Sequence, residues 1–92
     1  MQSIIQKECE CLVCRTTYNL HKHHCFFGKA NRKQSEKYGL TVFLCARHHN
    51  MSNAGVHFNK ELDDKIKELA QRKFEETHTR EEFRAIFGKS WL

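Results

Sequence analysis

Apolar residues near the C-terminus recur at helical spacing and predict two helices. The repeating positions of the longer one are Leu62, Ile66, Leu69, Ala70 and Phe74. Asn59 stands just before them, where it would cap the first turn of an amphipathic helix. A shorter helix is predicted after Thr79, because Thr79 and Glu82 have the spacing of a capping box and Gly88 would end it. We interpret both helices as packing support for the rest of the chain.

The first part of the chain has shorter runs that are typical of strands. Residues 19–27 suit an extended segment, and residues 40–44 form a second strand rich in β-branched and aromatic side chains. Between them, residues 29–37 form a polar, basic connection with a helical turn at its end. A short helix is expected over residues 45–51, ended by residues 53–55. The pattern therefore predicts an α+β domain.

Length and composition add the need for a stabilising element. A chain of 92 residues buries a small core, which makes a metal or a set of disulfides valuable. Its five cysteines are odd in number and its first residues lack the apolar run of a signal peptide, so metal is favoured over disulfides. No apolar run approaches the roughly 20 residues that cross a bilayer. We expect one soluble, cytoplasmic domain with no membrane partner.

Two ligand pairs have the spacing of a zinc site. They are Cys11-x-x-Cys14 and Cys45-x-x-His48, which together make a Cys3His set for structural Zn²⁺. Two intervening residues allow one tight turn or one helical turn to present both donors to a single ion. The first pair precedes the predicted strands and the second lies where a strand meets a helix. This layout is typical of a treble clef.

The remaining cysteines and histidines fall into two groups. Cys9 is an alternative to Cys11 as a ligand, but its spacing to Cys14 is looser. Cys25 is expected to be a small buried hydrophobe. His23 and His24 are neighbours on an extended segment, so they face opposite sides and cannot share one role. His49 follows a zinc ligand directly and would be held beside the zinc, where it can converge with the histidines of the strand.

The basic residues coincide with these candidate ligands. Residues 1–58 hold eight basic and three acidic side chains, whereas residues 59–92 hold eight of each. Every cysteine and six of the seven histidines lie in the basic segment. This coincidence favours a polyanionic partner, although a solvated basic face has the same composition. The candidate contacts are Lys29, Arg32, Lys33 and Lys37.

The order of these motifs resembles that of a known family. A C-x-x-C pair, then His-His on a strand, then a strand ending in Leu-Cys-x-x-His-His-Asn resembles the zinc-containing HNH endonucleases with the ββα-metal fold, over residues 11–59. The whole chain is similar to small HNH proteins encoded by phages and prophages. The resemblance implies His24 as general base, His23 as ligand of a catalytic divalent metal, and His49 as ligand of that metal or of the scissile phosphate. His57 is a further candidate, either as a third ligand or as a structural histidine.

The expected function is therefore metal-dependent hydrolysis of DNA phosphodiester bonds. Residues 1–10 would be a leader, residues 11–58 the zinc-bound HNH core and residues 59–92 the C-terminal helical support. Imidazole ligands favour Mn²⁺, Ni²⁺ or Zn²⁺ over Mg²⁺ as the catalytic metal, with Mg²⁺ still open. No small-molecule cofactor is expected, and a phage or prophage protein would work in the cytosol of its bacterial host.

The alternative is a non-catalytic zinc-binding module that binds nucleic acid. The family's middle asparagine would stand just ahead of the second strand, and Tyr38, Gly39 and Leu40 occupy that place. The histidines His23, His24 and His49 oppose this alternative, because a structural zinc site does not require them.

Overall fold

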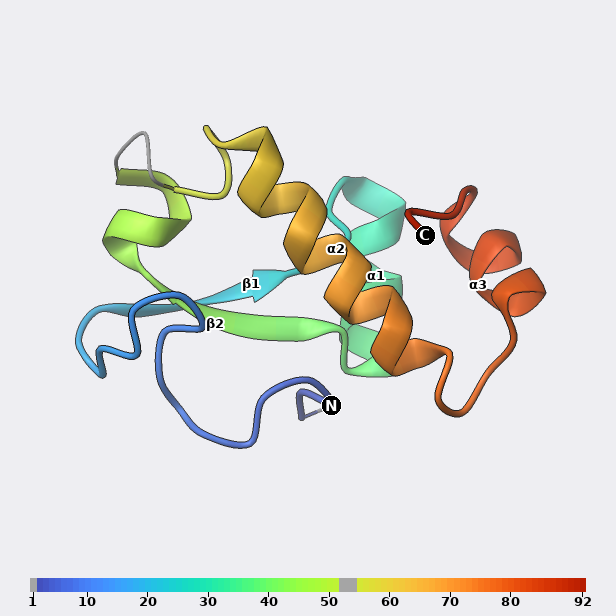
Figure 1. The fold of residues 1–92 in the computed structure, drawn as a ribbon, viewed down its shortest axis with the longest axis horizontal. Coiled ribbons are helices and arrows are strands. Elements are labelled where there is room, and N and C mark those ends of the chain that lie inside the picture. The colour runs from blue at the N-terminus through green and yellow to red at the C-terminus, as the bar shows by residue number, and fades with distance from the viewer. Residues whose placement is uncertain (1, 52–54) are drawn as a thin grey trace.

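Two strands, three α-helices and one short π-helix make up the part of the chain that the structure describes. This structure is a computed structural model and describes residues 2–51 and 55–92. The elements in order are β1 (Leu20–His24), α1 (Lys29–Tyr38), β2 (Thr41–Cys45), η1 (Arg47–Met51), α2 (Lys60–Phe74) and α3 (Arg80–Phe87) (Figure 1). The predicted α+β class is confirmed. The predicted end of the helix after β2, at Asn53 and Ala54, lies outside the described residues.

The sheet is an antiparallel pair of β1 and β2. Leu20 lies opposite Cys45 and His24 lies opposite Thr41. Because side chains alternate along a strand, residues two apart on β1 share a face. The C-terminal end of β2, which leads into η1, therefore lies beside the N-terminal end of β1, and the C-terminal end of β1 leads toward α1.

The N-terminal leader runs along the free edge of β2. The Phe43 N–H donates to Gln6 Oε1 at 2.6 Å, and the Leu12 N–H donates to the Phe43 carbonyl at 2.9 Å. The Ile4 N–H donates to the Gly39 carbonyl at 2.9 Å. These bonds pair backbone groups that an edge strand would otherwise expose.

The segment expected to be a polar connection is instead the ten-residue helix α1. Ser35 is its buried residue, and its hydroxyl donates to the Phe26 carbonyl at 2.7 Å and accepts from the Phe26 N–H at 3.1 Å. Gly39 ends the helix in the left-handed conformation, with φ of 70°. A Cβ there would meet the Gln2 carbonyl oxygen at 2.5 Å, so glycine is required.

Both C-terminal helices begin as the sequence predicts, and α3 also ends as predicted. The Asn59 side chain accepts from the Leu62 N–H at the start of α2. Thr79 and Glu82 form the capping box of α3, and Gly88 closes it at φ of 90°. Caps of this kind are local, since every partner lies within about one helical turn.

An aromatic core joins these helices to the sheet. The ring centroids of Phe26 and Phe83 are 5.1 Å apart, and those of Phe74 and Phe83 are 5.5 Å apart. α3 lies at one end of the molecule and η1 at the other, with α2 running between them (Figure 1). The aromatic core therefore packs near α3, and the candidate ligands of η1 lie at the opposite end of the molecule. No helix among the described residues is long and apolar enough to span a membrane.

Candidate metal centres

The first ligand pair lies in a tight turn. The Arg15 N–H donates to the Cys11 carbonyl at 2.9 Å, and the Cys11 N–H donates to the Thr16 carbonyl at 2.9 Å. Arg15 takes the left-handed conformation, with φ of 64°, which reverses the chain. The turn brings the sulfurs of Cys11 and Cys14 to the same side as the end of β2.

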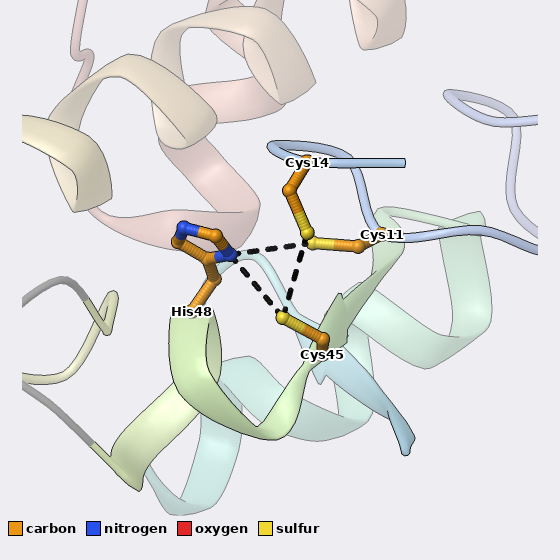
Figure 2. A group of neighbouring side chains, drawn as sticks. All are labelled: Cys11, Cys14, Cys45 and His48. Atoms are coloured by element: carbon orange, nitrogen blue, oxygen red, sulfur yellow. Dashed lines mark hydrogen bonds between the residues drawn. The ribbon is translucent and has the colours of Figure 1, made fainter. Parts of the chain in front are cut away.

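The four predicted zinc ligands converge on one point. Figure 2 shows the side chains of Cys11, Cys14, Cys45 and His48 directed toward a common centre, from the turn, the end of β2 and η1. The Cys14 and Cys45 sulfurs are 3.7 Å apart, and His48 Nδ1 is 3.2 Å from the Cys45 sulfur and 3.8 Å from the Cys11 sulfur. All four donor atoms lie within 4.8 Å of one another.

These separations fit one tetrahedral ion. With Zn–S distances of about 2.3 Å and Zn–N distances of about 2.0 to 2.1 Å, neighbouring sulfurs lie about 3.8 Å apart and sulfur and nitrogen about 3.5 Å apart. The sulfur pair at 3.7 Å matches, and the two sulfur–nitrogen distances lie on either side of the expected value. The Cys3His cluster can therefore hold a metal ion such as zinc.

The protein environment favours a thiolate at Cys11. Burial alone would raise the pKa of this thiol, but hydrogen bonds from backbone groups of Cys14, Cys45 and Val13 bring it down to about 6. For Cys14, a backbone hydrogen bond at Thr16 lowers the pKa, and burial together with the neighbouring sulfurs outweighs it and raises the pKa. Neighbouring sulfurs resist ionising together, and a cation bound between them would stabilise both thiolates.

The two surplus cysteines lie outside this cluster, as expected. Cys9 is exposed, and the turn brings Cys11 to the other ligands in its place. Cys25 is fully buried among apolar side chains, and this burial raises the pKa of its thiol.

A second cluster consists of His23, His49 and His57. Their candidate ligand nitrogens lie within 4.8 Å of one another. His49 Nε2 is 3.1 Å from His57 Nε2, and the His23 ring centroid is 5.4 Å from each of the other two rings. The His57 N–H donates to the His49 carbonyl at 3.3 Å, which places His57 beside η1. Nitrogens of imidazoles bound to one ion lie roughly 3.0 to 3.4 Å apart, so this spacing also fits a metal.

His23 supplies the strongest sign that this second cluster binds a ligand. Its side chain is 2% exposed, and its Nε2 has no hydrogen-bond partner among the described residues. A buried polar atom left without a partner costs about 1 to 3 kcal/mol. Burial, with smaller electrostatic contributions from His49, His57, His24 and Lys67, lowers the pKa of His23 to about 3. The ring is therefore neutral, which is the form that binds metal.

His24 lies outside this trio, as the alternation along β1 predicts. Its Nε2 is 3.8 Å from Glu36 Oε2 on α1. Burial lowers the pKa of His24, with Arg32 and Lys22 adding to the effect and the Glu36 carboxylate opposing it. A neutral imidazole at physiological pH can accept a proton.

An open pocket of about 210 Å³ joins His24 to the trio. It is lined by Lys22, His23, His24, Phe27, Arg32, His49 and His57. Of the four predicted nucleic-acid contacts, Arg32 lines this pocket. Lys29, Lys33 and Lys37 follow one another at four-residue spacing on α1, where all three are exposed. A phosphate in the pocket would therefore meet a cation as well as the imidazoles.

Sequence reasoning missed two residues of this site. Lys22 lines the pocket, and its Nζ is 2.6 Å from Glu36 Oε1. His21 Nδ1 lies 2.9 Å from His49 Nδ1. The period of two along a strand was the available signal for His21, since it marks His21 and His23 as neighbours on one face.

Comparisons with protein-family models, with curated proteins and with solved structures give no match. The chemistry of the two clusters is therefore the guide to function.

Proposed function

We propose that this protein is a metal-dependent endonuclease that hydrolyses phosphodiester bonds of DNA. The observation that carries the proposal is the buried, unpartnered Nε2 of His23, which faces two further imidazoles in a pocket shared with His24 and Arg32. A structural zinc site needs none of these five groups. The HNH resemblance of residues 11–59 supports the same function.

The Cys3His cluster would hold structural zinc, with Cys11 and Cys14 on the turn and Cys45 and His48 at the junction of β2 and η1. We interpret the turn, the sheet and η1 as a treble clef, and β1, β2 and η1 as the ββα-metal motif. Consecutive residues on a helix point in different directions. His48 can therefore face the zinc cluster while His49 faces the second cluster.

His23, His49 and His57 would hold the catalytic divalent ion. When bound, that ion would act as a Lewis acid on the phosphoryl and leaving oxygens. Three imidazole ligands favour Mn²⁺, Ni²⁺ or Zn²⁺, with Mg²⁺ also to be tested. Their part is to fix the position of the scissile phosphate relative to His24.

His24 would act as the general base. It takes a proton from a water molecule, whose oxygen forms a bond to phosphorus while one P–O ester bond breaks. The departing sugar oxygen then takes a proton from solvent. Glu36 Oε2, 3.8 Å from His24 Nε2, would stabilise the imidazolium that forms. Positioned proton transfer of this kind contributes about 10²- to 10⁴-fold to rate.

Basic residues would hold the DNA backbone. Arg32 and Lys22 line the pocket and would contact the reacting phosphate, while Lys29, Lys33 and Lys37 would contact neighbouring phosphates along α1. Contacts of this kind fix the register of the protein on the duplex and carry no sequence information directly.

Cleavage of supercoiled plasmid tests the proposal. Protein freed of exchangeable metal should give nicked or linear DNA when Mn²⁺, Ni²⁺ or Mg²⁺ is added. His24→Ala should lose about 10²- to 10⁴-fold of this activity. His78→Gln is the matched control, because His78 follows α2 and does not line the pocket. Equal residual cutting by wild type and His24→Ala would refute the enzyme, and DNA binding without cutting would leave the nucleic-acid-binding module.

A further inference from the structure

His21 contacts the second metal cluster without belonging to it. It lies on β1 two residues before His23, on the same face, and opposite Leu44 of β2. Its Nδ1 is 2.9 Å from His49 Nδ1, and the two rings meet edge to face with centroids 5.0 Å apart. His49 is therefore held by β1 from one side and reaches the cluster with its other nitrogen.

Hydrogen-bond chemistry limits which ring donates. Two imidazole nitrogens 2.9 Å apart form a hydrogen bond only when one carries a proton and the other offers a lone pair. His49 Nε2 lies in the cluster, 3.1 Å from His57 Nε2. An Nε2 that binds an ion carries no proton, so the proton of a neutral His49 is on Nδ1. His21 Nδ1 is then the acceptor.

We propose that His21 is a positioning residue for the catalytic metal site. Its Nδ1 accepts a hydrogen bond from His49 Nδ1–H, which holds His49 in the tautomer and ring orientation that direct its Nε2 lone pair toward His23 and His57. The inference rests on the proposed function of this cluster as a divalent-ion site. Outer partners of this kind typically change metal affinity by about 10- to 100-fold when they are removed.

Two variants separate hydrogen bonding from packing. His21→Phe keeps a ring of similar shape and removes the acceptor, whereas His21→Asn loses the ring and keeps an acceptor oxygen near the position of Nδ1. A role in packing predicts that the Phe variant is the milder one. A role in positioning His49 predicts the reverse.

The test measures binding of Ni²⁺ or Mn²⁺ to zinc-loaded protein by calorimetry, with folding checked by circular dichroism. We expect His21→Phe to bind the second ion about 10- to 100-fold more weakly and His21→Asn to stay close to wild type. Wild-type affinity in His21→Phe, or equal loss in both variants, would overturn the role of His21 and leave the proposed function standing. Absence of a second ion in wild-type protein would overturn both.

A second measurement needs no variant. Nitrogen-15 NMR of the wild-type histidine side chains reports which ring nitrogen carries the proton. The proposal predicts the Nδ1–H form for His49 and the Nε2–H form for His21. An Nε2–H form for His49 in zinc-loaded protein with the second ion bound would overturn it.

Discussion

Replacing Cys45 by alanine should unfold the domain. Cys45 is 7% exposed at the end of β2, and its sulfur lies 3.7 Å from the Cys14 sulfur and 3.2 Å from His48 Nδ1. A structural zinc ion supplies an apparent free energy of about 10 to 16 kcal/mol in small domains. A chain of 92 residues has a total stability of about 5 to 14 kcal/mol. Loss of a structural zinc ion from this cluster would therefore be comparable to the whole stability of the fold.

Two other cysteines provide matched controls. Cys25→Ala removes a fully buried thiol that lies outside the cluster, and should cost about 1 kcal/mol, or about 4 to 8 °C in Tm. Cys9→Ala changes an exposed side chain and should leave Tm unchanged. Thermal unfolding by circular dichroism, with zinc measured per chain, distinguishes the three. A Cys45→Ala protein that lacks zinc and has the same Tm as Cys25→Ala would refute a structural role for the metal.

Three further results are expected. Acid should destabilise the metal-free chain between pH 6.5, the ordinary pKa of histidine, and the lowered pKa of His23 near 3. The free energy of unfolding should fall by about 1.4 kcal/mol for each unit by which the pH is lowered, because the unfolded state binds a proton that the folded state does not. Thermal melts across this range check this, and His23→Gln should flatten the slope. Thr79→Ala should lose about 1 kcal/mol in chemical unfolding through its capping box, while Thr77→Ala loses less. Arg32→Ala should reduce the slope of log affinity for DNA against log salt by about 1, and Arg84→Ala should leave it unchanged.

Local signals account for what could be predicted from the sequence. The Cys11 and Cys45 ligand pairs each span one turn, and the caps at Asn59 and Thr79 bond to residues three positions away. Such contacts form wherever the chain takes the local conformation. The starts of α2 and α3 and the geometry within each ligand pair follow from these short-range patterns, whereas the meeting of the two pairs joins residues more than 30 positions apart.

Long-range contacts account for what was missed. α1 has no apolar stripe, and its buried residue is Ser35, whose hydroxyl is bonded to the backbone of Phe26. Periodicity of apolar residues cannot reveal a helix that is held in this way. The partner of His21 is His49, 28 residues away in sequence, so the contact depends on the sheet and η1 both being in place.

Cleavage activity measured against metal occupancy is the most direct test of the proposed catalytic metal site. Zinc-loaded wild-type protein, freed of other metals, is titrated with Mn²⁺ or Ni²⁺ while bound metal and plasmid cleavage are followed together. We expect one zinc per chain throughout, and cleavage that rises from background in proportion to occupancy of a second site that His23→Gln weakens. Cleavage that is independent of the second ion, or a filled second site that supports no cleavage, would contradict this expectation.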